Sequence, residues 1–240
     1  MSIYLTELDP HDLRFPSPFE ALEDPNGLLA FGGDLKPERI VAAYHHGIFP
    51  WYGPDDPILW WSPAPRAVFN PKTFKPAKSL KKFQRKHAYT VTINQATSQV
   101  IDLCAATRPP EETWLNPQMR HAYQTLASQG HCHSVEVWHS NQLIGGLYGI
   151  LVGRLFCGES MFSLQTNASK IALWYFCQHF AEHGGELIDC QVMNAHLASL
   201  GASEIPREAF LQSLLSLREQ HVDSPCFCPQ QLRLANQDPE

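Results

Sequence analysis

The most regular hydrophobic pattern in the chain covers residues 143–163. Residues 143–152 and 155–162 form two mainly apolar segments, and the pair Gly153-Arg154 separates them. Two apolar segments joined by a two-residue break that contains glycine are typical of a β-hairpin. We therefore expect two antiparallel strands here, and we take this hairpin as the element around which the rest of the chain is arranged.

Glycine interrupts the predicted hairpin at Gly145, Gly146, Gly149 and Gly158. A glycine inside a strand leaves room for another backbone or a ligand to come close. Glu159 follows the last of them, at the end of an apolar strand. Because an unpaired carboxylate is costly to bury, Glu159 is either a candidate for binding a cationic group such as an amine, or a structural acid or solvated strand end.

Ahead of the hairpin, the pattern predicts a short strand and then a helix. Turn residues flank an apolar strand over residues 28–31. A helix should follow, because Pro37 suits a first turn and Gly47 suits a C-terminal end. Ile40 and Tyr44 would share the buried face of this helix.

A proline-rich loop comes next and carries Trp51, Tyr52, Trp60 and Trp61. Large rings on a stiff loop form an apolar wall on which a base or a substrate side chain can stack. The alternative is that the rings are ordinary core residues.

The charge pattern changes after residue 71, where cations gather around one predicted helix. Ser79 is expected to cap this helix, and Leu80 and Phe83 to lie on its buried side. Its cations are Lys78, Lys81, Lys82, Arg85 and Lys86. A basic patch on a chain of net charge -6 favours an anionic partner such as a phosphate backbone, although many charge runs are only solvated faces.

Further helices are expected to begin near the cap residues Asn94, Asn116, Asn167, Asn194 and Pro206. The helix from Asn167 should be long, because apolar residues continue at helical spacing up to residue 180. The remainder from residue 221 is expected to be a tail.

Two more strands are predicted over residues 133–138 and 187–192. In the second strand, Asp189 and Gln191 should project from one face, because side chains alternate with a period of two. Several antiparallel strands followed by helices predict the α+β class, with a functional site at the strand ends.

Composition narrows the class of protein further. The chain has 240 residues and 44% hydrophobic residues, which fits a globular protein with a sizeable core. Apolar runs fall short of the roughly 20 residues of a membrane helix, and the acidic start has no signal-peptide pattern, so we expect a cytoplasmic protein. Seven cysteines without regular spacing do not indicate a disulfide framework. Cys226 and Cys228 are too close in sequence for an ordinary zinc knuckle.

Many uncommon strings in the chain resemble those of one family, the leucyl/phenylalanyl-tRNA-protein transferases of bacteria. The resemblance extends from Phe15 to about Arg218. The strings are PNGLLAFGGDL, AYHHGIFPWY, ILWWSPAPR, HSVEVW, GGLYGILVG, FCGESMFS, NASKIAL, LIDCQ and HLASLGA, together with the pair Thr113-Trp114.

The resemblance implies a small N-terminal α/β domain over residues 1–66. An acetyltransferase-like domain with a mainly antiparallel sheet would follow over 67–220, with the basic helix at about 78–87 and a tail over 221–240. The implied activity moves Leu, Phe and, less readily, Met from aminoacyl-tRNA to the amino group of proteins that begin with Arg or Lys, which marks them for degradation. The resemblance also implies no metal, nucleotide or other cofactor and no membrane, and we expect a monomer.

The family also implies roles for individual residues of the donor site. Glu159 would contact the amino group of the aminoacyl ester. Tyr44, Trp51 and Trp114 would surround the terminal adenosine. The predicted side-chain pocket and the rest of the donor site consist of Phe156, Met161, Phe176, Ile188 and Ser160, and the cations of the basic helix would bind tRNA.

One position departs from the family pattern. Ala64 in WWSPAPR stands where an acid is expected. If that acid helps to attract the Arg or Lys of the acceptor, this contribution is in doubt here.

The chemistry of ester-to-amide transfer fits the strand over 187–192. Such a reaction is downhill, so the enzyme has to hold ester and amine together, keep the attacking amine neutral and stabilise the oxyanion. Asp189 would orient the amide of Gln191, whose carbonyl would accept a hydrogen bond from the attacking amine. Because glutamine is a very poor base, we interpret Gln191 as a positioning group of the catalytic pair.

Three other functions stay open from the sequence. Cys157 or Cys190 could act as a nucleophile in a cysteine transferase, although both fit a buried strand equally well. His131, His133 and His196 could bind a metal, although ordinary histidines are the commoner case. A pure RNA-binding module would explain the basic helix and the aromatic loop, but would leave Glu159, Asp189 and Gln191 unexplained.

Overall fold

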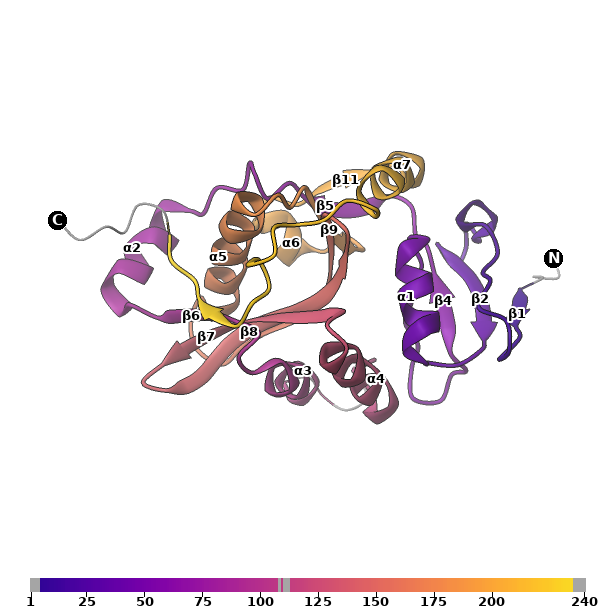
Figure 1. Ribbon diagram of the computed structural model, residues 1–240, viewed down its shortest axis with the longest axis horizontal. Helices are drawn as coiled ribbons and strands as arrows, with labels where there is room; N and C mark the ends of the chain where they lie inside the picture. The colour runs from indigo at the N-terminus through magenta and orange to yellow at the C-terminus, as the bar shows by residue number, and fades with distance from the viewer. Residues whose placement is uncertain (1–4, 108, 110–112, 235–240) are drawn as a thin grey trace.

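Two β-sheets and the helices that cover them make up the fold in the computed structural model, which describes residues 5–107, 109 and 113–234 (Figure 1). The prediction of a chain with both helices and sheets is therefore confirmed. Parts of three predicted regions lie outside the described residues: the start of the chain, the loop ahead of Thr113 and the end of the tail.

The smaller sheet comes from the first quarter of the chain, in the order β1-β2-β4-β3. Its strands are β1 (Thr6–Leu8), β2 (Leu28–Gly32), β3 (Phe49–Pro50) and β4 (Leu59–Trp61), and a short 3-10 helix η1 (Pro18–Glu20) lies between the first two. Helix α1 (Pro37–His45) begins with proline and has Ile40 and Tyr44 buried, as predicted. α1 faces the large sheet in Figure 1 and contacts α4 and β8.

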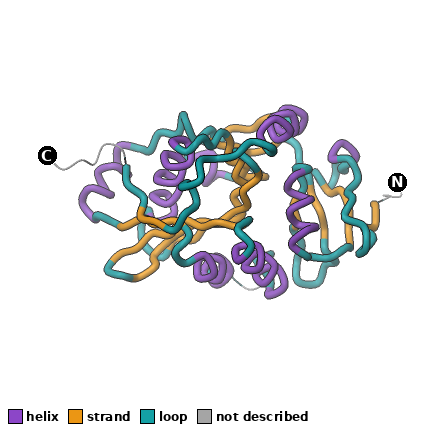
Figure 2. The backbone as a smooth tube through the Cα atoms, in the orientation of Figure 1, coloured by secondary structure: helices purple, strands orange, loops and turns teal. Residues whose placement is uncertain are grey.

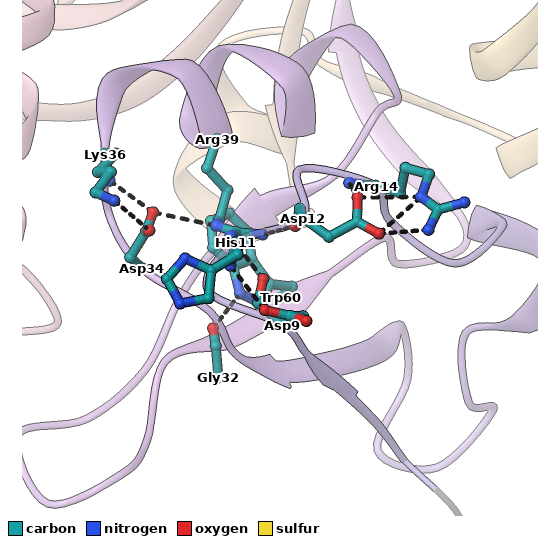
Figure 3. A network of polar contacts seen from close by, with 9 residues as sticks. All are labelled: Asp9, His11, Asp12, Arg14, Gly32, Asp34, Lys36, Arg39 and Trp60. Carbon is teal, nitrogen blue, oxygen red and sulfur yellow. Dashed lines mark hydrogen bonds and ion pairs between the residues drawn. The ribbon is translucent and has the colours of Figure 1, made fainter.

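A buried arginine fixes the start of the chain to α1 (Figure 3). The Arg39 side chain is 0% exposed and donates hydrogen bonds to the carbonyl oxygens of Asp9 and Asp12 (2.9 and 2.8 Å). It also pairs with the Asp34 carboxylate (3.1 Å). Gly33 packs against the guanidinium at a φ of +72°, where an added Cβ would lie 3.1 Å from Arg39 Nε. Because a lone buried charge is costly, these bonds make Arg39 an anchor for residues 9–12.

The larger sheet has the order β11-β5-β10-β9-β8-β7-β6-β12. Its pairs are antiparallel except for β9 with β10, which run parallel. The strands are β5 (Arg66–Phe69), β6 (Thr90–Ile93), β7 (Cys132–His139), β8 (Gln142–Val152), β9 (Leu155–Ser163), β10 (Leu187–Gln191), β11 (Ser203–Ile205) and β12 (Gln230–Gln231). The predicted hairpin is thus confirmed as β8 and β9.

Glycine is needed inside the hairpin because of close backbone contact. A Cβ added at Gly149 would lie 2.1 Å from the carbonyl oxygen of Cys157 and 2.6 Å from the ring of Phe156. The register of β8 and β9 shifts at this point, between Tyr148 and Gly149. Gly149 therefore allows an irregular pairing directly beside the strand that carries Glu159.

Helices cover both faces of the large sheet (Figure 1). Helix α5 (Ala168–Glu182) packs on β8, β7 and β9 and is buried over most of its length. Helices α3 (Thr97–Ala106) and α4 (Pro117–Ser128) contact the sheet and each other on the opposite face. The remaining helices are α2 (Lys78–His87), α6 (Ala195–Ser199) and α7 (Arg207–Leu217). None of the helices in the described ranges is both long and apolar enough to cross a membrane.

The buried core is continuous between the two sheets. One cluster includes Leu29 and Trp60 of the small sheet together with Val100, Tyr123 and Phe162 of the larger unit. β5, the first strand of the large sheet, begins at Arg66. The division into domains at residue 66 and the acetyltransferase-like type stay predictions.

Several local predictions were wrong. Ser79 lies inside α2, whose N-cap is Ala77, and Asn167 precedes α5 in a left-handed conformation without a side-chain cap bond. The predicted tail over 221–234 is an integral segment: Figure 2 shows a long loop that leads from α7 to β12, β12 pairs with β6, and Cys226 is fully buried. A loop without helical or strand periodicity gives no pattern from which this packing could be predicted.

Candidate active site

The candidate site lies where the only parallel pairing of the described large sheet ends. β9 and β10 pair from Leu155 with Leu187 up to Cys157 with Asp189. Beyond these residues a cavity of about 700 Å³ opens between the two strands and the segments that follow them. Its polar lining includes Glu159 and Gln191, which follow the last pair of β9 and β10.

Most of the cavity wall is apolar and comes from distant parts of the chain. Besides Glu159 and Gln191, its lining includes Phe49, Pro50, Trp51, Phe69, Trp114, Leu147, Tyr148, Phe156, Gly158, Ser160, Met161, Phe162, Leu173, Phe176, Ile188, Cys190, Val192 and His196. A concave apolar site with a few convergent polar groups is the usual form of a small-ligand site.

Glu159 is held at the cavity wall by side chains from three other elements. Gln191 Nε2 of β10 donates to Glu159 Oε1 (2.9 Å), and Tyr123 Oη of α4 donates to Glu159 Oε2 (2.9 Å). Since the Tyr123 proton is used in this bond, Tyr123 accepts from Tyr44 Oη of α1 (2.7 Å). The chain Tyr44–Tyr123–Glu159–Gln191 therefore fixes the carboxylate and aims it at the cavity.

Burial raises the pKa of Glu159 to about 7. The hydrogen bonds from the tyrosines and Gln191 oppose this rise, and the charge of Asp189 adds to it. Near neutral pH both the charged and the neutral form of the carboxyl group are therefore populated. A cation bound next to it would favour the charged form.

Asp189 lies beneath the cavity in a buried ion pair with Arg66. The side chains are 0% and 1% exposed, and Arg66 donates two hydrogen bonds, Nε to Oδ1 (2.9 Å) and Nη2 to Oδ2 (2.7 Å). Arg66 also donates to the carbonyl oxygen of Gly47 (2.9 Å) and lies over the ring of Phe210 (4.3 Å). Burial alone would lower the pKa of Arg66. The negative charge of Asp189 outweighs this effect, so the pKa of Arg66 is raised.

The predicted alternation of Asp189 and Gln191 on one face was wrong. The pairing of β10 with β5 has one extra residue between them, and Gln191 has a φ of +64°. This bulge turns the Gln191 side chain into the cavity while Asp189 stays in the core. Asp189 accepts from the backbone N–H of Gln191 (2.9 Å), not from its side-chain amide. It therefore positions Gln191 through the backbone.

Sequence comparisons match the chain to the models of one known family. The model of the leucyl/phenylalanyl-tRNA protein transferases matches residues 68–215, and the model of the N-terminal domain of the same proteins matches residues 33–64. The chain belongs to the leucyl/phenylalanyl-tRNA protein transferase family.

Curated relatives with this name match over almost their whole length. A leucyl/phenylalanyl-tRNA–protein transferase of Vibrio cholerae serotype O1 is 73% identical, over 95% of this chain and 93% of the relative. Those of Vibrio vulnificus and Photobacterium profundum are 70% and 61% identical, each over 98% of this chain and over 100% and 99% of their own lengths. Among solved structures, a conserved protein of unknown function from Bacteroides thetaiotaomicron aligns with 66% of this chain and 57% of its own, with a TM-score of 0.42 and 13% identity, from which we conclude nothing.

Most residues that the transferase family implies for the donor site lie together at the cavity. Trp51, Trp114, Phe156, Ser160, Met161, Phe176 and Ile188 all line it. Tyr44 does not. Its side chain is 1% exposed, and its hydroxyl interacts with Tyr123 and with the Glu159 carboxyl group behind the cavity wall. The placement of Tyr44 around the terminal adenosine stays a prediction.

The alternative nucleophiles do not have the surroundings of a reactive thiol. Burial raises the pKa of Cys157 well above its ordinary value, and Cys190 is affected in the same way. Hydrogen bonds from a histidine to either thiol are absent from the described residues. Both cysteines are therefore neutral thiols, whereas a cysteine nucleophile has to be a thiolate. This geometry does not favour a cysteine transferase.

The predicted histidine alternative is also wrong. His131 precedes β7, so it does not alternate with His133 on a strand. His133 is bonded to Asn94 (2.9 Å) and stacked on Phe227 (4.0 Å), and His196 lies at the cavity. These three histidines do not form a ligand group in the described part of the chain.

Sequence reasoning missed Arg66 and Tyr123 as parts of the site. Arg66 stands at the end of the family string ILWWSPAPR and opens the apolar strand β5, and a charge at the start of a buried strand was the available signal. Tyr123 fitted the apolar face of α4 and gave no polar signal. Its role becomes visible only when α4 packs against β9.

The predicted tRNA-binding cations lie on the exposed side of α2. Lys78, Lys81, Lys82, Arg85 and Lys86 are exposed, and none of them forms an ion pair with another described residue. α2 packs on α5, at the end of the molecule opposite the small sheet in Figure 1. The patch is therefore free to meet a large anion.

Proposed function

We propose that this chain transfers Leu, Phe and, less readily, Met from aminoacyl-tRNA to the α-amino group of proteins that begin with Arg or Lys. The observation that carries the proposal is the bond between Glu159 and the Gln191 amide at an apolar cavity. The product marks the acceptor for degradation. Because the donor is charged tRNA, we infer that the reaction takes place in the cytoplasm.

The reaction converts the ester of aminoacyl-tRNA into an amide. The neutral α-amine of the acceptor attacks the ester carbonyl, a C–N bond forms, and the C–O bond to the terminal ribose of tRNA breaks. The amine proton ends on the ribose hydroxyl. Since an amide is more stable than an ester, the enzyme supplies positioning and charge stabilisation, of which positioning alone is worth about 7–11 kcal/mol. No metal or nucleotide is needed at the reacting atoms.

Glu159 is the group we assign to the amino group of the donor ester. Its carboxylate is fixed on both oxygens by Gln191 and Tyr123, so its position is set before substrate arrives. A bound ammonium favours the charged carboxylate, which matches a group whose pKa is raised to about 7 in the empty site. Tyr44 contributes by holding Tyr123.

Gln191 is the group we assign to the attacking amine. Its amide nitrogen is occupied by Glu159, which leaves the amide oxygen to accept a hydrogen bond from the amine. Asp189 and Arg66 support this position from below, because Asp189 holds the Gln191 backbone N–H and Arg66 holds Asp189. Asp189 is thus a positioning residue and does not touch the substrate.

The remaining walls suit an aromatic or γ-branched donor side chain next to a nucleoside. Phe156, Phe176, Met161 and Ile188 line the apolar part. Trp51 is 47% exposed and packs edge-on against Trp61 (5.5 Å), so a face stays available for stacking. We place the terminal adenosine between Trp51 and Trp114.

We assign the cations of α2 to the phosphate backbone of tRNA. We also expect that the enzyme binds the acceptor protein as a monomer. Ala64 lies in the loop ahead of Arg66 and exchanges two hydrogen bonds with the Asn26 side chain (2.7 and 3.2 Å). It carries no charge for the Arg or Lys of the acceptor, so we expect that other groups recognise this side chain.

Turnover tests the proposal directly. The protein is mixed with Phe-tRNA and a peptide that begins with Arg, and mass spectrometry follows the product. We expect a peptide extended by Phe, and no product from the same peptide with an acetylated N-terminus. Binding of charged tRNA without product would contradict the proposal and favour a pure RNA-binding module.

A further inference from the structure

Three side chains with metal-ligand chemistry come together away from the cavity, between α5 and the C-terminal segment (residues 221–234). His179 lies in the last turn of α5, His183 is the C-cap residue of this helix, and Cys226 belongs to the segment. One ligand atom from each lies within 4.8 Å of the other two. This spacing is close to that between the ligands of one small cation.

Hydrogen bonds to the backbone leave one nitrogen of each histidine ring available to a metal. His179 Nε2 bonds to the carbonyl oxygen of Cys226 (2.7 Å), and His183 Nδ1 bonds to the carbonyl oxygen of His179 (2.8 Å). A carbonyl oxygen only accepts, so each of these nitrogens carries a hydrogen and the other nitrogen of each ring keeps its lone pair. Metal-binding histidines almost always donate their second nitrogen to such a partner.

The sulfur of Cys226 has no competing partner in the described part of the chain, although its burial raises the pKa of the thiol to about 12 and so opposes the loss of its proton. Cys226 is 0% exposed, and its thiol has no hydrogen-bond partner among the described residues. His183 is only partly buried, which leaves an entry route from solvent.

We propose that His179, His183 and Cys226 bind a divalent transition-metal ion, and that zinc fits them best. Two imidazoles and one thiolate are ligands that zinc accepts in a tetrahedral arrangement, with water in the fourth position. On binding, the Cys226 thiol releases its proton to solvent and the sulfur forms the metal bond. The site is separate from the proposed transfer reaction and does not depend on it.

The ion would tie the C-terminal segment to α5 and so support the cavity wall. Phe227 follows Cys226 and packs against Phe156 and Phe176 (6.2 and 6.3 Å). Both of these phenylalanines line the cavity. A metal on Cys226 would therefore hold Phe227 behind that wall.

Metal binding to purified protein tests the proposal. Protein stripped with a chelator is dialysed against zinc, and bound metal is counted per chain. We expect one zinc in the wild-type protein, and at least tenfold weaker binding after Cys226→Ser or His183→Gln. Cys228→Ser is the matched control, because this neighbouring thiol is exposed and outside the group.

Two further measurements, the absorption of bound cobalt and thermal unfolding with zinc, test metal binding even if one variant folds poorly. Cobalt should give the absorption of a thiolate-bound ion in wild-type and Cys228→Ser protein, and not in Cys226→Ser. Zinc should raise the thermal midpoint of the first two proteins, and not of His183→Gln, whose partly exposed side chain is a mild change. A wild-type protein that binds no zinc, or variants that bind it as tightly as wild type, would show that the three residues are only packed together.

Discussion

At the scale of single residues, the site depends on one carboxyl group whose pKa is raised and one whose charge is fully compensated. Glu159 is held by Tyr123 and Gln191 and has a pKa of about 7, whereas Asp189 is paired with Arg66 on both oxygens. The first can change its charge when a substrate amine binds. The second is held by Arg66 and has a structural role.

Glu159 should make stability depend on pH in a defined direction. Its pKa of about 7 lies above the 4.5 of an ordinary glutamate, so the folded chain binds more protons than the unfolded chain between these values. Its contribution is therefore fully present below pH 4.5 and is lost as pH rises through 7. We expect Glu159→Gln to gain stability relative to wild type between pH 5 and 8, by on the order of 2 kcal/mol.

Chemical denaturation of both proteins across this range measures the effect. Other groups titrate alike in the two proteins, so their contributions cancel in the difference. A difference that stays constant from pH 5 to 8 would mean that the pKa of Glu159 is not raised in the folded chain.

Arg66 and Asp189 should behave as one unit in unfolding. Arg66→Met leaves a buried carboxylate, and Asp189→Leu leaves a buried guanidinium, so each single change should cost about 3–5 kcal/mol. The double variant should lose clearly less than the sum, because it buries no unpaired charge. Urea unfolding measures all three. Strictly additive losses would contradict the pairing.

The residue scale also shows where sequence reasoning stopped. It identified Glu159, Asp189 and Gln191 but assumed regular alternation in β10. The single extra residue opposite β5 turns Gln191 into the cavity and leaves Asp189 in the core. A bulge of one residue leaves no trace in a pattern of apolar and polar positions, so the roles of the two side chains could not be separated beforehand.

At the scale of elements, the spacing of apolar residues predicted the helices and strands that are long and regular. The hairpin of β8 and β9, the helices α1, α4 and α5 and the strand β10 were found because their apolar positions repeat. The short strand β11 has little apolar repeat and exists because it pairs with β5. Such pairing partners are distant in sequence and have no local signal.

The basic helix α2 gives the prediction at this scale. Lys82→Glu and Arg85→Glu should each weaken tRNA binding, with little effect on a short aminoacyl-adenosine donor that has no tRNA backbone. With about six phosphate contacts, wild-type affinity should fall about a thousandfold between 50 and 200 mM salt, and each change should reduce this dependence. Binding titrations at several salt concentrations give both quantities.

Lys36→Glu is the charge-matched control, since Lys36 is an exposed lysine that precedes α1, at the other end of the molecule. It changes the net charge by the same amount as Lys82→Glu. Equal losses for Lys36→Glu and Lys82→Glu, or equal losses on both kinds of donor, would reject a specific role for α2.

At the scale of the whole molecule, the cavity combines parts that are far apart in the chain. Trp51 lies beside the small sheet, Trp114 precedes α4, and Gln191 ends β10, yet all three line one space. The resemblance to a family predicted a set of donor-site residues, and most of them line this cavity. The sequence could not predict that Tyr123 connects α1 to Glu159, or that Cys226 meets α5, because both contacts depend on how complete elements pack.

The most direct test of the account is the rate of Phe transfer from Phe-tRNA to a peptide that begins with Arg, measured in a single turnover at saturating donor. The account predicts that Gln191→Ala lowers this rate by about a hundredfold, the scale of one lost positioning contact, while tRNA affinity and thermal midpoint stay near wild type. Gln212→Ala, an exposed glutamine on α7, should transfer Phe at the wild-type rate. A well-folded Gln191→Ala protein that also transfers Phe at the wild-type rate would contradict the account.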